Sequence, residues 1–195
     1  MSALSGALGS VAALLSGADR AWALVGALAV SARTEPRFTR DIDIAIAVAD
    51  DADAENVVRY LAQRGYAVFS VVEQDATKRL ATARLSGAAL PGETPVIVDL
   101  LFASSGIEPE IARAAEVLTI VPGVDMPVAR SGHLLALKVL SRSDGRPQDA
   151  ADIVALLRVL DGPERARAFD AARLIADRGF ARGKDLRAEL TALLG

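Results

Sequence analysis

Cysteine is absent from this 195-residue sequence, which excludes disulfide bonds and thiolate metal sites. Long apolar runs are absent too, since no stretch reaches the roughly 18 uninterrupted residues that a membrane-spanning helix requires. The Ala- and Leu-rich amino terminus lacks the basic start of a signal peptide, and Asp19 and Arg20 interrupt it. We therefore expect a cytoplasmic protein with no membrane partner.

An excess of positive charge is also lacking. The net charge is −3, so no overall basic field would attract nucleic acid, and RNA binding would require a local basic patch. The chain is nevertheless long enough to bury about 70% of its unfolded surface in a core. Its organisation predicts an α/β core over residues 1–128 and a helical region over residues 129–195 that closes a cleft.

Hydrophobic periodicity predicts an α/β (α+β) fold, in which a small, mixed, twisted sheet is flanked by helices and followed by a C-terminal helical bundle. Strands are expected at residues 21–26, 41–48, 66–73, 78–86 and 94–103. Helices are expected at residues 3–18, 27–33, 53–64, 107–116, 131–143, 148–160, 163–177 and 184–194. Residues 121–127 (VPGVDMP) are expected to form a loop.

Two aspartates open the most strand-like segment, DIDIAIAV. Side chains alternate along a strand, so Asp41 and Asp43 share one face with Cα atoms roughly 7 Å apart, while the isoleucines between them face a core. The paired carboxylates repel each other, and a hard cation such as Mg²⁺ or Mn²⁺ would relieve the repulsion. The alternative is an ordinary solvated strand edge.

A third aspartate, Asp99, lies within the apolar segment VIVDLLF. A buried charge is costly unless it is compensated, and a cation or an arginine such as Arg84 would compensate it. If Asp99 instead lies beside Asp41 and Asp43, three carboxylates could hold two metal ions roughly 4 Å apart, as in phosphoryl and nucleotidyl transfer. Both interpretations remain open from the residues alone.

Gly26 stands where a predicted strand ends and a helix begins. A helix N-terminus presents free N–H groups and a partial positive charge, and glycine lets a phosphate approach the backbone closely. Glycine also ends many strands without any ligand, but here the two aspartates follow in order. The intervening loop could neutralise a triphosphate or merely balance nearby acids through Arg33, Arg37, Thr39 and Arg40.

Taken together, the Gly26–Ala27 turn, residues 37–43 (RFTRDID) and Asp99 resemble the signature of the polymerase-beta-type nucleotidyltransferase superfamily. The similarity extends in particular to its minimal AbiEii-like branch, which supplies toxins to bacterial toxin–antitoxin pairs. One departure is Ala27, because many members of the superfamily carry a serine there whose hydroxyl contacts a phosphate.

The resemblance continues in the segment LLALKVLSRSDGRPQDAADIVALL, where Lys138 and Asp149 match the lysine helix and the acidic helix of the family. Each has a plain alternative: Lys138 could extend to water, and Asp149 could simply favour a helix N-terminus. Asp152, one turn further on, could pair with Lys138 or with a loop arginine. His133, the single histidine, is expected to be partly exposed and not catalytic.

The resemblance implies a metal-dependent enzyme that moves a nucleoside monophosphate from an NTP to a hydroxyl of tRNA, protein or a small molecule, with a cognate antitoxin as partner. Its catalytic residues would be Asp41, Asp43, Asp99 and Lys138, and the three aspartates would bind Mg²⁺ or Mn²⁺. The nucleotide would contact Gly26, Ala27, Arg37, Thr39, Lys138 and Asp149. The alternative is a catalytically weakened nucleotide-binding or regulatory module, consistent with Ala27.

Overall fold

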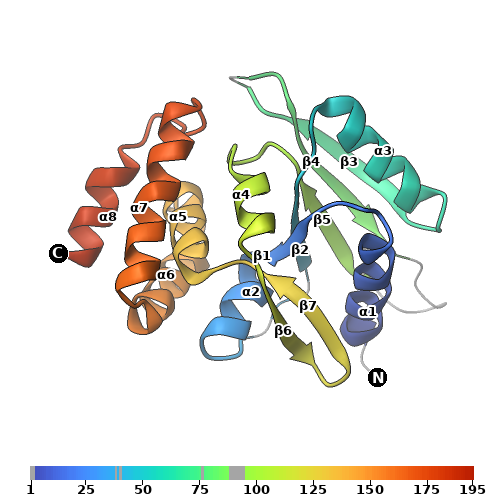
Figure 1. Ribbon diagram of the computed structural model, residues 1–195, viewed down its shortest axis with the longest axis horizontal. Helices are drawn as coiled ribbons and strands as arrows, with labels where there is room; N and C mark the ends of the chain where they lie inside the picture. Colours follow the sequence, from blue (N-terminus) through green and yellow to red (C-terminus); the bar gives the residue numbers. More distant parts are fainter. Residues whose placement is uncertain (1–2, 38, 40, 76, 88–94) are drawn as a thin grey trace.

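The computed structural model describes residues 3–37, 39, 41–75, 77–87 and 95–195. It contains one mixed sheet with flanking helices and a separate group of C-terminal helices, so the predicted fold class is confirmed (Figure 1). The strands are β1 (Trp22–Val25), β2 (Asp41–Ile46), β3 (Ala67–Glu73), β4 (Leu80–Ser86), β5 (Ile97–Leu101), β6 (Glu116–Val121) and β7 (Val124–Val128).

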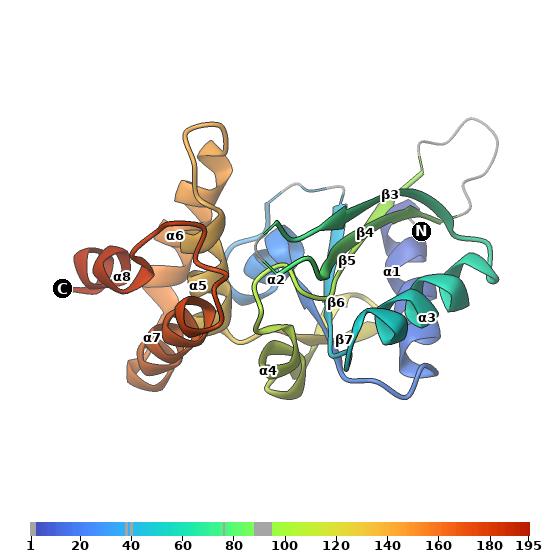
Figure 2. The same ribbon diagram turned by 90° about the horizontal axis from the view of Figure 1, so that it is seen from above.

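The helices fall into two groups. Those packed around the sheet are α1 (Ala3–Ser16), α2 (Gly26–Arg33), α3 (Asp51–Ala62) and α4 (Glu108–Arg113). Those of the C-terminal half are α5 (Ser131–Ser141), α6 (Pro147–Val159), α7 (Gly162–Asp177) and α8 (Leu186–Leu194). Seen from above, α5 to α8 lie beside the sheet at one end, and α1 and α3 lie at the other (Figure 2). The proposed division into residues 1–128 and 129–195 stays a prediction.

The seven-stranded sheet has the order β3-β4-β5-β2-β1-β7-β6. At its centre β2 pairs parallel with β5 and antiparallel with β1, and β5 pairs antiparallel with β4. In this register Asp43 is the partner of Asp99, and Asp99 is in turn the partner of Arg84. Three charged residues from three different strands therefore lie level with one another across the sheet.

The alternation predicted for β2 is confirmed. Ile42, Ile44 and Ile46 are at most 1% exposed and belong to the core, together with their neighbours on β5, Val98 and Leu100. Because side chains alternate between the two faces of a strand, the aspartates between them point away from this core. The burial of the aliphatic face thus fixes the direction of the acidic side chains.

Close packing joins α5 to α7 in the helical half. A Cβ atom at Gly132 would lie 2.2 Å from the backbone oxygen of Glu164, and the Gly132 N–H donates to the Glu164 carboxylate at 2.8 Å. The neighbouring His133 is 6% exposed, so the expectation of a partly exposed histidine was wrong. Burial, reinforced by the charge of Arg167, lowers the pKa of His133 to about 4, which keeps the ring neutral.

Two expectations about residues 107–128 were also wrong. The predicted helix ends at Arg113, and residues 121–127 are not a loop but belong to the β6–β7 hairpin. The Pro122–Gly123 pair forms the turn of that hairpin, with Gly123 at a φ of 81°. Strand β6 (EVLTIV) is rich in β-branched residues, so the local composition does fit a strand on a sheet edge.

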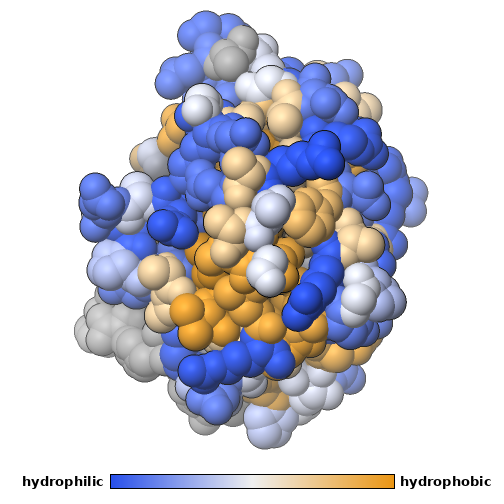
Figure 3. All heavy atoms as spheres, turned by 90° about the vertical axis from the view of Figure 1, so that its left-hand side faces the viewer, coloured by the Kyte–Doolittle hydropathy of each residue, from blue (hydrophilic) through white to orange (hydrophobic). Residues whose placement is uncertain are grey.

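The outer face of the helical half shows a continuous apolar area bordered by charged side chains (Figure 3). Within the described part of the chain, no helix has the length and hydropathy needed to cross a membrane.

Candidate active site

A cavity of about 420 Å³ lies between the sheet and helices α5 and α6. The nine residues expected to bind metal or nucleotide all line this cavity, although they come from five separate segments of the chain. They are Gly26, Ala27, Arg37, Thr39, Asp41, Asp43, Asp99, Lys138 and Asp149. The structure therefore brings the predicted residues together, while their individual catalytic, metal-binding and nucleotide-binding roles stay predictions.

Asp43 carries the least compensated charge of the three strand aspartates. Its pKa is raised to about 6, mainly by burial and further by the negative charges of Asp99 and Asp41, while Lys138 opposes the shift. The contribution of Asp99 follows from the sheet register, which sets Asp43 directly beside Asp99. A carboxylate in this environment gains from a cation placed next to it.

Asp99 already has a cationic partner. Arg84 donates to both carboxylate oxygens, from Nε to Oδ1 at 2.8 Å and from Nη2 to Oδ2 at 2.6 Å. This bidentate contact raises the pKa of the Arg84 guanidinium further, so that it stays charged. The sequence left open whether Asp99 is paired with an arginine or lies beside the other two aspartates. In the structure Asp99 is paired with Arg84 and also lies beside Asp43.

The carboxylates fit one divalent cation better than two. Among the residues that the structure describes, no three Asp, Glu or His side chains lie close enough together to hold a metal ion. Asp41 and Asp43 share a face of β2 at the cavity, and Mg²⁺ commonly takes one or two carboxylates together with substrate phosphates. Asp99 would have to lose its hydrogen bonds from Arg84 before it could bind a metal ion.

Gly26 is required where it lies. Its φ is 65°, and a Cβ atom built on it would be 1.9 Å from the Asp43 carboxylate. The residue opens α2, whose preceding residue, Val25, offers no side-chain cap, so the first N–H groups of the helix have no such partner. A phosphate bound to these groups would approach Asp43 closely, and a cation between the two anions would remove their repulsion.

Lys138 lies in an ion-pair network that joins α5 to α6. Its ammonium is 2.9 Å from Asp149 and 2.8 Å from Asp152, both almost completely buried. Arg37 adds two hydrogen bonds to Asp152, at 2.7 and 2.8 Å, and thereby ties the loop before β2 to α6. Burial alone would raise the pKa of Asp152, but the hydrogen bonds from Arg37 and Lys138 outweigh it and hold the pKa below its usual range.

The other residues expected to neutralise a triphosphate differ in where they lie. Arg33 does not line the cavity, because it donates to the carbonyls of Ala129 and Val128 and pairs with Glu116. Thr39 lies at the cavity, whereas Arg40 is outside the described residues.

Several residues that line the cavity were not predicted from the sequence to belong to the site. Arg146 and Arg182 line the cavity, as do Ser104 and Ser105 from the segment after β5. Arg146 directly precedes the Pro-Gln-Asp start of α6, inside the segment that matches the family, and this position could have signalled it. Arg182 comes from the turn between α7 and α8, where no local pattern marks it.

With this geometry established, comparison with known proteins becomes informative. Residues 11–194 match the family described as "Nucleotidyl transferase AbiEii toxin, Type IV TA system". The chain belongs to the AbiEii family. The resemblance predicted from its motifs is therefore confirmed, and this AbiEii protein is a nucleotidyltransferase by family. A search of curated proteins returns no match.

Three solved structures resemble this chain, and the first of them supports the fold. A crystal structure of an antigenic nucleotidyltransferase-like protein from Paracoccidioides brasiliensis is 16% identical, with a TM-score of 0.57, over 98% of this chain and 91% of that chain. A putative nucleotidyltransferase from H. pylori is 16% identical, with a TM-score of 0.48, over 98% of this chain and 91% of that one. Lincomycin-bound LnuA, a lincosamide antibiotic adenylyltransferase, is 16% identical, with a TM-score of 0.47, over 77% and 94%.

Replacing Gly26 tests the contact with Asp43. Both Gly26 and Gly123 have positive φ angles, which cost a non-glycine residue about 1–2 kcal/mol. A Cβ at Gly123 meets no atom within 4 Å, whereas at Gly26 it overlaps Asp43 and adds strain of roughly 1–3 kcal/mol. We therefore expect Gly26→Ala to lose more free energy of unfolding in urea than Gly123→Ala. Equal losses would contradict the close contact.

Replacing Asp43 tests its raised pKa in the metal-free protein. The shift from 3.8 to about 6 corresponds to roughly 3 kcal/mol of destabilisation when the carboxylate is charged in both the folded and unfolded states. Asp43→Asn should thus be more stable than the wild type above about pH 6. The advantage should shrink as the pH falls and vanish below about 3.8, where the carboxyl is neutral in both states.

The control for this prediction is Asp53→Asn, because Arg20 lowers the pKa of Asp53 through a hydrogen bond. That variant should lose stability at neutral pH, and its loss should disappear in acid. Thermal unfolding from pH 3 to 8 gives both trends, and a pH-independent effect of Asp43→Asn would contradict the raised pKa.

Lys138 should be needed for stability as well as for any catalysis. Lys138→Met leaves Asp149 and Asp152 buried without their shared cation, and breaking such a pair costs about 3–5 kcal/mol. The control is Lys184→Met, because Lys184 donates to neutral backbone carbonyls and its loss should cost about 1 kcal/mol. Chemical denaturation measures both, and similar small losses would place Lys138 outside the buried network.

Proposed function

We propose that this AbiEii protein transfers a nucleoside monophosphate from an NTP to an acceptor hydroxyl with the help of a divalent cation. The observation that carries the proposal is the contact between Gly26 and Asp43. It sets the partly exposed start of α2, suited to phosphate, against a carboxylate suited to a cation. A metal-bound triphosphate satisfies both requirements.

The triphosphate would lie between the start of α2 and the helical half. Backbone N–H groups at Gly26 and Ala27 would bind phosphate oxygens, so the missing serine hydroxyl is not essential. Arg37, Lys138 and Arg146 line the same cavity and would neutralise the remaining phosphate charge. Since these cations are held by Asp149 and Asp152, they are positioned before the nucleotide arrives.

Asp41 and Asp43 would hold Mg²⁺ or Mn²⁺, which when bound would neutralise phosphate charge and polarise the α-phosphate. The nucleotide and the acceptor would be aligned by side chains that the fold already fixes. This positioning would supply much of the rate enhancement. Asp99 lies on the neighbouring strand, where a lone pair that the Arg84 contact leaves free would accept the proton of the attacking hydroxyl.

The proposed transfer forms one bond to the α-phosphorus and breaks another. The acceptor oxygen forms a bond to the α-phosphorus, and the bond from that phosphorus to the bridging oxygen breaks. The electron pair of the broken bond leaves with pyrophosphate, and the hydroxyl proton passes to Asp99 and then to solvent.

The acceptor we propose is a phosphate-bearing one, the end of an RNA such as tRNA, ahead of a protein hydroxyl or a small molecule. Arg84, which pairs with Asp99, and Arg182, which donates to Ser104 after β5, both line the cavity and favour an anionic acceptor over a polycationic aminoglycoside. Because the net charge is −3, the contact would involve a chain end, not a long stretch of nucleic acid. As a member of a Type IV toxin–antitoxin family, the protein would have a cognate antitoxin.

A second candidate is a nucleotide-binding or regulatory module with little or no transfer activity. The pairing of Arg84 with Asp99 favours it, because that pairing removes one carboxylate from the metal site. Ala27, which lacks a hydroxyl for phosphate, points the same way.

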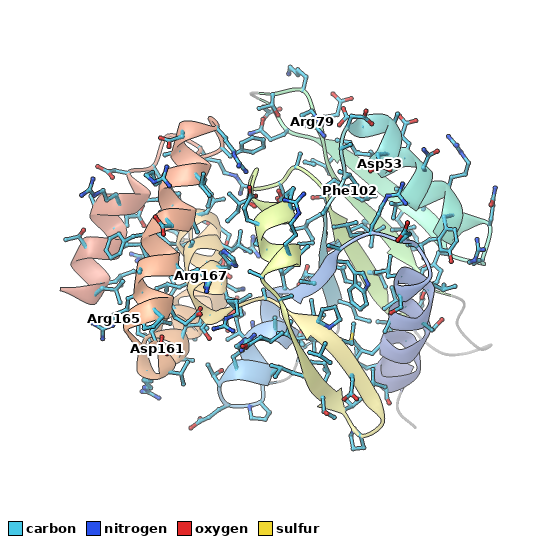
Figure 4. The ribbon with its side chains drawn as sticks, in the orientation of Figure 1. Asp53, Arg79, Phe102, Asp161, Arg165 and Arg167 are labelled. Carbon is cyan, nitrogen blue, oxygen red and sulfur yellow. The ribbon has the colours of Figure 1, made fainter. Side chains whose placement is uncertain are left out.

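Label transfer separates the two candidates. We expect the purified protein, incubated with Mg²⁺ or Mn²⁺, one of the four α-³²P-labelled NTPs and cell extract, to move label onto RNA. Asp43→Asn should abolish transfer, because the cation loses a ligand, whereas the distant Asp53→Asn should retain it. Asp53 lies on α3, with Arg79 nearby, at the end of the molecule opposite α7 (Figure 4).

The same mixtures, measured for thermal stability, report nucleotide binding independently of transfer. Metal-dependent stabilisation by an NTP without any label transfer would favour the binding module. Neither stabilisation nor transfer with any of the four nucleotides would contradict both candidates.

A further inference from the structure

We propose that Arg84 is a fixed cation that takes the place of a second metal ion at Asp99, so that the site operates with a single divalent cation. This inference rests on the proposed nucleotidyl transfer and specifies the composition of its catalytic centre. It departs from the expectation that Asp41, Asp43 and Asp99 together hold two metal ions.

The first support is the geometry of the pair. Arg84 and Asp99 are register partners on the adjacent strands β4 and β5, so their backbones are held together by the sheet. Both oxygens of Asp99 accept from the guanidinium, at 2.8 and 2.6 Å, and Asp99 is only 7% exposed. A bidentate arginine–carboxylate pair built on two interior strands is a structural part of the sheet.

The second support is the charge around the site. Asp41, Asp43 and Asp99 carry three negative charges, which one guanidinium and one divalent cation neutralise. Arg84 is close enough for Asp41 and Asp43 to stabilise its charged form, although neither is its direct partner. A second divalent ion at Asp99 would be placed against this permanent cation, and it would have to displace two charge-assisted hydrogen bonds.

The third support is the position of the guanidinium. Arg84 lines the cavity with about half of its side chain exposed, so its outer edge faces the space beside Asp99. An arginine there can donate to an acceptor or to phosphate oxygens while it holds Asp99 in place, because a guanidinium has five N–H donors. Arg84 thus supplies, from the sheet, positive charge that a second metal ion would otherwise supply.

Counting bound Mn²⁺ by electron paramagnetic resonance tests the proposal without an activity measurement. The full-length protein is titrated with Mn²⁺ and with each of the four α,β-methylene nucleoside triphosphates in turn. We expect one magnetically isolated Mn²⁺ per chain in the wild type. In Arg84→Ala the carboxylate of Asp99 is free, so the number should rise from one to two and the spectrum should show a spin-coupled pair.

Two control variants make the result specific. Arg84→Ala combined with Asp99→Asn should return to one isolated ion, because the freed carboxylate is gone. Arg79→Ala removes an arginine from the same hairpin that is also ion-paired, to Asp51 at 2.6 Å, but that lies outside the cavity. It should behave as the wild type and so separate the effect of Arg84 from a general loss of an ion pair.

The outcomes are distinguishable. A coupled Mn²⁺ pair in the wild type would overturn the role of Arg84 and leave nucleotidyl transfer standing. A well-folded Arg84→Ala that still binds one ion would also overturn it, and if that variant does not fold, the wild-type spectrum decides alone. No protein-bound Mn²⁺ with any nucleotide in any variant would remove the proposed function together with this inference.

Discussion

The pairing of β2 with β5 is the constraint on which the site depends. Its parallel register sets the like charges of Asp43 and Asp99 side by side, while the same strands bury their aliphatic residues on the opposite face. The fold can relieve this repulsion in few ways. One carboxylate takes an arginine from β4, and the other is left with a pKa of about 6, which a bound cation would bring down. The cavity chemistry follows from that asymmetry.

The helical half also holds two buried carboxylates close together, and cations compensate their charges. Two buried aspartates on α6 share Lys138, and Arg37 reaches across to Asp152 from the loop that precedes β2. Of the side chains that would meet the triphosphate, Lys138 therefore holds α5 to α6, and Arg37 joins the loop before β2 to the helical half. Stability and function are coupled there, so loss of activity on mutating Lys138 would not by itself identify a catalytic group.

Much of this was predictable because it depends on local pattern. The spacing of Asp41 and Asp43 fixes a shared face, and the glycine between strand and helix marks the start of α2. What local pattern could not give depends on distant contacts. The sequence offered Arg84 as one possible partner of Asp99, but only the β4–β5 register decides that the two pair, and the burial of His133 requires α7. The β6–β7 hairpin was missed because its Pro-Gly turn, taken alone, fits a loop equally well.

Ala27 and Arg84 both mark places where this site differs from the expected pattern of side-chain and metal contacts. Ala27 has no hydroxyl, yet under the proposed function the backbone N–H groups at the start of α2 would still bind phosphate. Asp99 is paired with Arg84, and under our proposal this guanidinium, anchored on the sheet, would supply positive charge beside the acceptor. In both places the proposed contact comes from the backbone or from an arginine that the sheet holds, and not from a serine hydroxyl or a second metal ion. The proposed mechanism would thus keep the positive potential that nucleotidyl transfer needs.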